Sequence, residues 1–234
     1  MAELKMGDRF KRYEAVSDQY LVRRLPVVIR VDIAAGHTLT RGLEKPYDKL
    51  FAHSMYQTAK YLCENIQGAK LAYVQSDEIS VLLTDYDELT TDAWFDNRVN
   101  KMVSHSASRA SVRFSNAFSA YCGPPYKVVV FDSRAFNIPE NDVANYFIWR
   151  QIDAERNSLQ ALAQANFSHK SLQGLNRSAL QEKLFTEKGI NYNDIDPYQK
   201  RGAIVIKREG SWKIEPAPIF SQNREVIEEL IPSG

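Results

Sequence analysis

The chain alternates short apolar runs with longer amphipathic segments. Residues 27–31 form a β-branched and almost unbroken apolar run, which is typical of a central strand covered on both faces. In residues 46–66, apolar side chains recur every three or four positions, and this spacing predicts a helix that faces the core. Two strands are expected within residues 69–83, on either side of the polar turn 75–78.

The rest of the chain continues this alternation. Further expected elements are an amphipathic helix at 7–21, helices at 92–118, 140–164 and 176–187, a strand at 126–131, and a closing hairpin of strands 203–207 and 211–214. Through residue 131 the predicted order is strand, helix, strand, strand, helix, strand. This βαββαβ order indicates an α+β fold of the ferredoxin-like class, with both helices on one face of the sheet.

Composition narrows the class of protein. Hydrophobic residues make up 44% of the 234 residues and charged residues 25%, which indicates a folded globular core. The net charge is only +1, so a site for a polyanion must be a local concentration of basic residues. The two cysteines, Cys63 and Cys122, form no CxxC pair, which argues against a disulfide scaffold or a thiolate zinc site and favours a reducing compartment. With no signal peptide and no membrane-spanning run, we expect a cytoplasmic protein without a membrane partner.

Three carboxylates are expected at one edge of the sheet. Asp32 ends the first strand, while Asp77 and Glu78 lie in the turn between the next two strands. In a ferredoxin-like sheet that strand and that hairpin are neighbours, so the carboxylates would converge, repel one another and attract hard cations. This arrangement suits a two-metal magnesium centre for nucleotidyl transfer. Ordinary turn chemistry, with Asp32 capping a strand, carries equal weight from topology alone.

Basic residues supply a second signal. Four of them recur at spacings of 3, 4 and 4 along the predicted helix 92–118, namely Arg98, Lys101, His105 and Arg109. Such a stripe near carboxylates would suit a triphosphate–magnesium complex, although a solvated helix face is the plain alternative. Lys45 precedes a helix N-terminus, which is another favourable place for phosphate. P-loop, Rossmann and zincin motifs are absent from the sequence.

Six sequence blocks resemble the tRNA-His guanylyltransferase family, and they occur in the order found in that family. The blocks are Gly7-Asp8-Arg9, Arg30-Val31-Asp32, Lys45-Pro46-Tyr47-Asp48, Ala72-Tyr73-Val74-Gln75-Ser76-Asp77-Glu78, Phe131-Asp132-Ser133-Arg134 and Trp149-Arg150-Gln151-Ile152-Asp153. Residues 156–170 and 189–194 resemble more narrowly its bacterial, archaeal and phage branch of guanylyltransferase-like proteins. The resemblance covers about residues 7–207.

The resemblance implies a 3′–5′ nucleotidyltransferase that adds nucleotides to the 5′ end of tRNA, either to repair 5′-truncated tRNA or to guanylate tRNA-His. ATP would adenylylate a 5′-monophosphate, and the 3′-hydroxyl of an incoming GTP or other NTP would then attack. The family also implies two Mg²⁺ ions and a homotetramer built as a dimer of dimers. Residues 1–135 would form a polymerase-palm-like catalytic core, and residues 136–234 a helical and hairpin extension packed on it as one integrated domain.

The same resemblance implies roles for individual residues. Asp32, Asp77 and the backbone of Ile33 would hold the metal ions, and Glu78 would support them as a third catalytic residue. The expected nucleotide-binding residues are His37, Lys45, Asp48, Ser76, Arg98 and Lys101. The expected RNA-binding residues are Arg134, Arg150, Asp153, Asn157, Lys200 and Arg201.

Three departures from the family pattern affect these expectations. Ile33-Ala34 replaces a common Gly-Arg pair after the metal-binding aspartate, although the carbonyl of Ile33 can still serve. Leu180 stands where the family often has a lysine, with Lys183 nearly one turn further on. Residues 155–158 replace a His-Ile-Asn-Asn motif that accompanies guanylation of tRNA-His, which favours template-directed repair.

Two other functions remain open from the sequence. A nucleotidyl cyclase shares the palm-like sheet and its carboxylate hairpin, but the Gly-Gly-Asp/Glu-Glu-Phe signature of diguanylate cyclases is replaced by residues 75–79. A non-catalytic RNA-binding protein is the other alternative, because βαββαβ sheets also carry RNA-recognition modules. Tyr73 and Tyr126 are strand aromatics, but neither lies in an RNP-like string.

Overall fold

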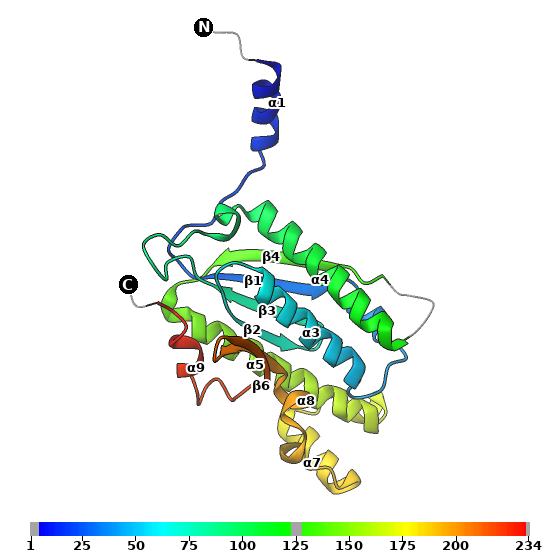
Figure 1. Ribbon diagram of the computed structural model, residues 1–234. Helices are drawn as coiled ribbons and strands as arrows, with labels where there is room; N and C mark the ends of the chain where they lie inside the picture. Colours follow the sequence, from blue (N-terminus) through cyan, green and yellow to red (C-terminus); the bar gives the residue numbers. More distant parts are fainter. Residues whose placement is uncertain (1–4, 123–127, 233–234) are drawn as a thin grey trace.

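The computed structural model describes residues 5–122 and 128–232, without the side chains of His37 and Cys122. One antiparallel sheet runs through the molecule in the order β4-β1-β3-β2-β5-β6 (Figure 1). Its strands are β1 (Val27–Ile33), β2 (Ala69–Gln75), β3 (Glu78–Leu83), β4 (Phe131–Asn137), β5 (Ala203–Arg208) and β6 (Ser211–Pro216). The α+β class predicted from the sequence is confirmed.

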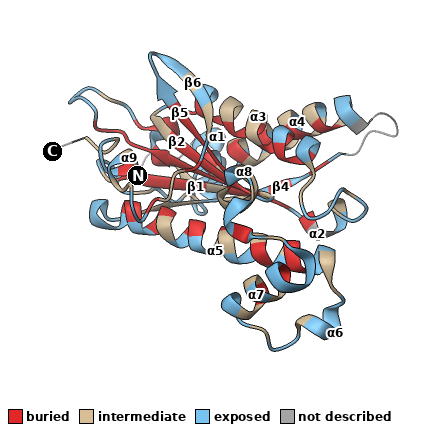
Figure 2. Cartoon of the chain, turned by 90° about the horizontal axis from the view of Figure 1, so that it is seen from below, coloured by how far each residue is buried: buried red, intermediate tan, exposed pale blue. Residues whose placement is uncertain are grey.

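Helices cover both faces of the sheet. On one face, α3 (Lys49–Asn65) and α4 (Val99–Cys122) pack over Val27, Ile29 and Val31 of β1. On the other face, α5 (Glu140–Asn166) packs over Val28 of the same strand. Figure 2 shows the buried residues concentrated in the sheet and on the helix sides that face it. The nearly continuous apolar run in β1 therefore reflects burial on both faces, as the sequence predicts.

The remaining helices are short or peripheral. They are α1 (Met6–Ala15), α2 (Gly36–Leu39), α6 (His169–Leu172), α7 (Arg177–Lys188), α8 (Pro197–Arg201), α9 (Glu225–Glu228) and the 3₁₀ turns η1 (Trp94–Asn97) and η2 (Tyr192–Asp194). None of the helices in the described ranges combines the length and hydrophobicity of a membrane-spanning helix.

The predicted closing hairpin is confirmed, and it extends the main sheet. Glu209 (φ 49°) and Gly210 (φ 78°) both have positive φ, as a two-residue type I′ turn requires. Strand β5 pairs with β2, with Val205 opposite Ala72. Residues from the C-terminal half of the chain therefore share one sheet with the N-terminal half.

Several predicted elements differ from the structure at their ends. The helix predicted at 92–118 begins only at Val99, because Phe95 and Asp96 have positive φ within η1, which precedes α4. Helix α1 stops at Ala15, short of residue 21, because the following chain runs alongside η1: the Leu21 N–H donates to the Asn97 carbonyl (2.9 Å). Helix α1 buries no side chain and projects from the body in Figure 1. The strand predicted at 126–131 begins only at Phe131, because the N–H of Val129 donates to Ser115 Oγ on α4 (2.9 Å); residues 126 and 127 lie outside the described ranges.

Candidate functional site

Acidic residues from three neighbouring strands meet at one edge of the sheet. Strand β1 runs toward the turn between β2 and β3, and its Asp32 is paired through Cα with Glu78 of β3 and Asp132 of β4. The N–H of Ile33 donates to the carbonyl of Asp77 in that turn (3.2 Å). The structure therefore brings Asp32 and Asp77 together although 45 positions separate them in the sequence.

Negative charge dominates the electrostatics at Asp32. The pKa of the Asp32 carboxyl is raised from 3.8 to about 6, first by partial burial and then by the charges of Asp77, Glu78 and Asp132. Arg30, two residues earlier on β1, lowers it by a smaller amount. A carboxylate in such surroundings gains stability from any cation that binds beside it.

Glu78 does not share this open position. Its side chain is buried, and its two oxygens accept hydrogen bonds from Nε and Nη2 of Arg150 on α5, each at 2.8 Å. In the described ranges, no group of three or more His, Cys, Asp and Glu side chains is placed to hold one ion. The sequence predicts all three carboxylates at this edge of the sheet, with Glu78 in a supporting role. In the structure Glu78 ties the start of β3 to α5, whereas Asp32 and Asp77 form the open pair.

Gly36 allows the Asp77 carboxylate to occupy its position. A Cβ built on Gly36 would lie 2.0 Å from Asp77 Oδ2, which is far inside van der Waals contact. Gly36 opens α2 directly after the left-handed Ala35 (φ 62°). Gly36 was not among the site residues predicted from the sequence, where its only signal is its place four residues after Asp32.

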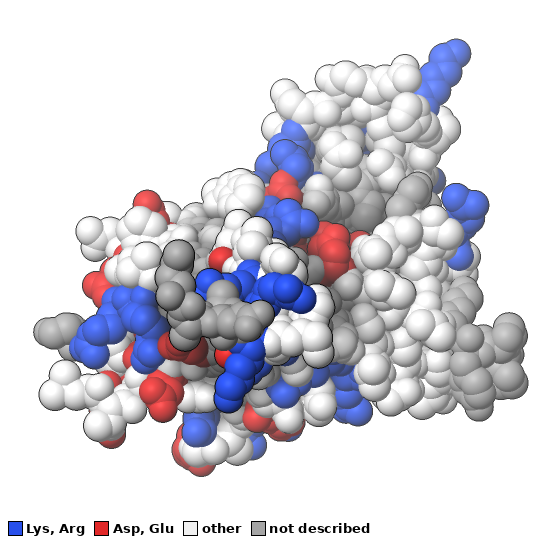
Figure 3. Space-filling view, turned by 90° about the horizontal axis from the view of Figure 1, so that it is seen from above, with Lys and Arg blue, Asp and Glu red and all other residues white. Residues whose placement is uncertain are grey.

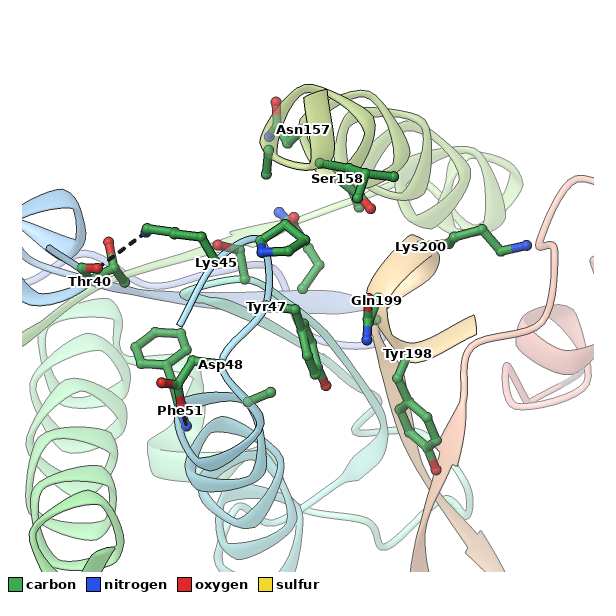
Figure 4. Close-up of a pocket in the computed structure, with 18 of the residues that line it drawn as sticks. Thr40, Lys45, Tyr47, Asp48, Phe51, Asn157, Ser158, Tyr198, Gln199 and Lys200 are labelled. Atoms are coloured by element: carbon green, nitrogen blue, oxygen red, sulfur yellow. Dashed lines mark hydrogen bonds between the residues drawn. The ribbon is translucent and has the colours of Figure 1, made fainter. Parts of the chain in front are cut away.

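A cavity of about 230 Å³ opens beside the β2–β3 turn (Figure 4). Its walls come from the loop before α3, the end of β2, the second half of α5 and α8. Five of the predicted nucleotide- or RNA-binding residues line it, namely Lys45, Asp48, Ser76, Asn157 and Lys200. Ser76 has a positive φ of 50°, and it links this cavity to Asp77.

Some of these cavity residues have partners within the chain. Asp48 caps α3, where its Oδ1 accepts from the N–H of Phe51 (2.8 Å). Lys45 Nζ donates to the carbonyl of Thr40 (3.2 Å), and Lys200 Nζ donates to the carbonyl of Asn193 (2.6 Å). Carbonyl oxygens leave the charge of both lysines uncompensated, so both can attract an anion.

Aromatic rings form a second component of the cavity that the sequence analysis missed. The hydroxyls of Tyr47 and Tyr56 are 3.0 Å apart, and the rings of Tyr56 and Tyr198 lie 5.6 Å apart between centroids. Figure 4 shows Tyr47 from the loop before α3 and Tyr198 from α8, with their rings pointing in the same direction. The spacing of Tyr47 and Tyr56 within the predicted helical region was the only available signal, and Tyr198 is too distant in sequence to be grouped with them.

Other predicted residues lie away from the carboxylates. Strand β3 runs away from the β2–β3 turn, so the helix that follows it begins at the opposite end of the sheet. Arg98 and Lys101 lie there, and Arg98 Nε donates to Asp18 Oδ1 (2.8 Å). The structure therefore does not place these two residues beside Asp32 of the same chain (Figure 1).

The predicted RNA-binding residues have varied surroundings. Arg150 is 7% exposed, so it has little surface for a direct RNA contact. Asp153 lies between Arg150 (3.5 Å) and Arg156, and Arg201 Nε donates to the carbonyl of Ala217 (3.3 Å). Arg134 is exposed beside Asp132, at 3.6 Å. His37 belongs to α2, but its side chain lies outside the described part of the structure.

The raised pKa of Asp32 predicts a pH-dependent cost in stability for the metal-free protein. Because the folded state holds the Asp32 proton up to about pH 6, its free energy of unfolding falls as the pH rises from about 4 to about 6. Asp32→Asn removes this loss and should stabilise the protein at pH 7 by about 1 kcal/mol, a value reduced for solvent screening of the half-exposed carboxyl. Urea unfolding in a chelator at pH 7 and pH 4 measures it. Equal stability of variant and wild type at pH 7 would contradict the prediction, and the difference should disappear at pH 4.

Sequence comparison adds family information to this geometry. A sequence model described as tRNAHis guanylyltransferase matches residues 7–139, and one described as the Thg1 C terminal domain matches residues 141–229. The tRNA(His) guanylyltransferase of Schizosaccharomyces pombe is 30% identical over 84% of this chain and 80% of its own length.

Structure comparison points the same way. A bacterial tRNA(His) guanylyltransferase (Thg1)-like protein in complex with ATP superposes with a TM-score of 0.94 at 49% identity, covering 97% of this chain and 99% of its own. A bacterial protein of the same description in complex with GTP gives a TM-score of 0.83 at 40% identity, covering 97% and 98%.

Proposed function

The chain belongs to the tRNAHis guanylyltransferase family and is a nucleotidyltransferase, and we propose that it adds nucleotides to the 5′ end of tRNA in the 3′–5′ direction. The observation that carries the proposal is the convergence of Asp32 and Asp77 beside a cavity with lysine and tyrosine side chains. The proposed roles are repair of 5′-truncated tRNA and guanylation of tRNA-His, as the family resemblance implies.

The proposed reaction has two steps. First, an oxygen of the tRNA 5′-monophosphate attacks the α-phosphorus of ATP, and pyrophosphate leaves. Then the 3′-hydroxyl of GTP or another NTP attacks the 5′-phosphorus of the tRNA, the new P–O bond forms, the bond to AMP breaks, and the hydroxyl proton is lost to solvent or to a nearby base. The relatives solved in complex with ATP and with GTP support these two substrates.

Asp32 and Asp77 suit the two Mg²⁺ ions that the family implies. Magnesium prefers oxygen ligands, and the carboxylates of Asp32 and Asp77 and the carbonyl of Ile33 would provide them where the end of β1 meets the β2–β3 turn. The raised pKa of Asp32 and the space left by Gly36 around Asp77 are both consistent with a cation site. When bound, magnesium neutralises phosphate charge and lowers the pKa of the attacking hydroxyl. Asp32 and Asp77 would hold the ions, and Glu78 would keep the strand end rigid through Arg150.

The cavity beside Ser76 is the proposed site for the incoming nucleotide. Lys45 and Lys200 would attract the triphosphate, while Ser76 and Asn157 offer hydrogen bonds to its oxygens or to the sugar. The tyrosine rings offer apolar area for the base. Asp48 would act mainly by fixing the start of α3.

The proposal also covers the domain organisation and the oligomeric state. The strand order β4-β1-β3-β2 supports a ferredoxin-like, palm-like catalytic core within residues 1–135, onto which residues 136–234 add strands and helices. Basic and acidic side chains are interspersed on the face in Figure 3, so a tRNA would need local contacts spread over a wide surface. The proposed homotetramer would provide that surface and would let Arg98 and Lys101 of one chain serve a substrate held by another. A cytoplasmic location stays a prediction.

Gly36→Ala should lower the rate of nucleotide addition without lowering the stability of the fold. The added Cβ would push the Asp77 carboxylate from its place, and a displacement of about 1 Å can lower a rate about a hundredfold. Stability should be unchanged or slightly higher, because alanine favours a helix and the obstructed atom is the end of a side chain. Single-turnover nucleotide addition and thermal unfolding measure the two effects. Gly7→Ala is the matched control, because its new Cβ would meet nothing within 4 Å; full activity of Gly36→Ala would contradict the proposed role of Asp77.

Incorporation of labelled NTP into tRNA that lacks its first nucleotide tests the proposed function. A 5′-monophosphate tRNA should require ATP for activation, whereas a 5′-triphosphate tRNA should not. GTP alone should yield no cyclic product. Tight tRNA binding without any incorporation, or formation of a cyclic nucleotide, would overturn the proposal.

A further inference from the structure

An exposed tryptophan lies on the α5 face of the sheet, outside the nucleotide cavity. Trp149 is 53% exposed, whereas its neighbours Tyr146 and Arg150 are buried, and it does not line the cavity beside Ser76. The exposed ring gains no stabilisation from burial, so its apolar faces are available for a binding contact.

The ring of Trp149 is held in a fixed orientation. Its centroid is 5.9 Å from that of Tyr146, and Cζ of Arg150 lies over its plane at 4.6 Å. Arg150 is itself fixed by its two hydrogen bonds to Glu78, and Tyr146 by a hydrogen bond with Ser80 (2.9 Å). One face of the indole therefore rests on a rigid support, and much of the ring remains open to solvent.

Two arginines lie on the same side of the sheet, and each has only a long ion pair, that of Arg134 being with Asp132 at 3.6 Å. Arg30 of β1 is directly opposite Arg134 of β4, and like charges in that position repel. In the described ranges, the buried Nε of Arg30 has no hydrogen-bond partner. The ion pair of Arg30 with Glu78 is long, at 3.8 Å, because Arg150 already occupies both oxygens of that carboxylate. An anionic group bound at the exposed guanidinium of Arg134 would relieve this repulsion.

The surface formed by Trp149, Arg30 and Arg134 is connected to the open carboxylates. Arg30 precedes Asp32 by two residues on β1, a distance of about 7 Å along a strand. Tyr146, which supports Trp149, also packs against Phe136 of β4, with ring centroids 5.8 Å apart. The nucleotide cavity lies beside the β2–β3 turn, whereas this surface follows β1 and β4, so Asp32 stands between them.

We propose that Trp149 stacks on a base at the 5′ end of the acceptor RNA while Arg30 and Arg134 contact its phosphates. This inference rests on the proposed function and adds the position of the second substrate. An exposed aromatic ring on the same face of the sheet as two arginines has the chemistry of a single-stranded nucleic-acid site, because stacking accepts any base and arginine binds phosphate. A 5′ end held there would present its terminal phosphate at Asp32, opposite the incoming nucleotide.

Kinetics of Trp149 variants test the proposal. With 5′-monophosphorylated tRNA lacking its first nucleotide, Trp149→Ala should raise the KM for tRNA about tenfold and change the KM for GTP less than about twofold. Trp149→Phe should recover most of the loss, because it retains an aromatic face. Phe185→Ala on α7 is the matched control, since Phe185 is an aromatic residue of similar exposure (59%) elsewhere on the surface, and it should behave as wild type.

A binding measurement separates this inference from the proposed function. Of the three tryptophans, Trp94 is buried and Trp212 is partly buried, so tRNA without added nucleotide should quench mainly Trp149. This quenching should disappear in Trp149→Phe while filter binding persists. If the protein incorporates nucleotides but Trp149→Ala leaves the KM for tRNA unchanged, the inference fails and the function stands. If tRNA quenches Trp149 but the protein incorporates no nucleotide, the inference stands and the proposed function fails. A Trp149→Ala variant that only changes the oligomeric mass would make the ring a subunit contact and overturn the inference.

Discussion

Asp77→Asn should lower the rate of nucleotide addition about a thousandfold or more while the protein stays folded. The substitution keeps the shape of the side chain but removes one of the two open carboxylates at the end of β1 and the β2–β3 turn. Loss of several kcal/mol of stabilisation of the phosphate charge corresponds to this factor. Removal of the Asp77 charge also relieves its repulsion of Asp32, so the metal-free variant should be as stable as the wild type or more so.

Single-turnover incorporation at saturating ATP, GTP and tRNA measures the effect on the chemical step. Asp132→Asn is the matched control, because Asp132 is also next to Asp32 and contributes to the same field, but its side chain is 59% exposed and pairs with Arg134. It should lose less than about fivefold. Equal losses of rate in the two variants would mean that activity depends on the total negative charge near Asp32 and that Asp77 does not bind a metal ion. Wild-type activity of Asp77→Asn would remove the proposed metal site altogether.

Much of the fold could be predicted because the apolar pattern and the layers of the sheet obey the same geometry. The run 27–31 is buried on both faces, and the helical spacing in 46–66 became the core-facing side of α3. Antiparallel neighbours in this order place Asp32 opposite Glu78. The meeting of Asp32 with the β2–β3 turn therefore followed from strand order, before any side chain was placed.

The parts of the site that could not be predicted depend on side-chain direction and on the ends of elements. Spacing predicted a basic stripe that included Arg98 on one helix, but Arg98 precedes α4, and only the direction of β3 decides at which end of the sheet that helix begins. A turn sequence cannot distinguish Asp77, which stays open, from Glu78, which faces inward toward Arg150. The need for glycine at position 36 arises from one close approach to Asp77, which is invisible without coordinates.

The ion pair of Glu78 with Arg150 should dominate the stability of the site. Both side chains are buried, with side-chain exposures of 9% and 8%. Arg150→Met should lower the free energy of unfolding by about 3–5 kcal/mol, because it leaves the Glu78 carboxylate buried with only a long contact to Arg30. Urea unfolding monitored by circular dichroism measures this loss. Arg208→Met is the control, since Arg208 makes a paired contact with Glu215 at an exposed hairpin and should cost at most about 1 kcal/mol.

The double variant Arg150→Met with Glu78→Gln distinguishes two explanations of that loss. If the loss of stability arises from the unpaired, buried charge of Glu78, removal of that charge should restore most of the stability. Activity should stay low, because β3 and Trp149 lose their common support. If the arginine contributes mainly by filling space against α5, the double variant should be no more stable than Arg150→Met alone. Recovery of stability without recovery of activity would therefore mean that the buried ion pair positions the β2–β3 turn. It would also mean that the ion pair stabilises the fold no more than a neutral pair does.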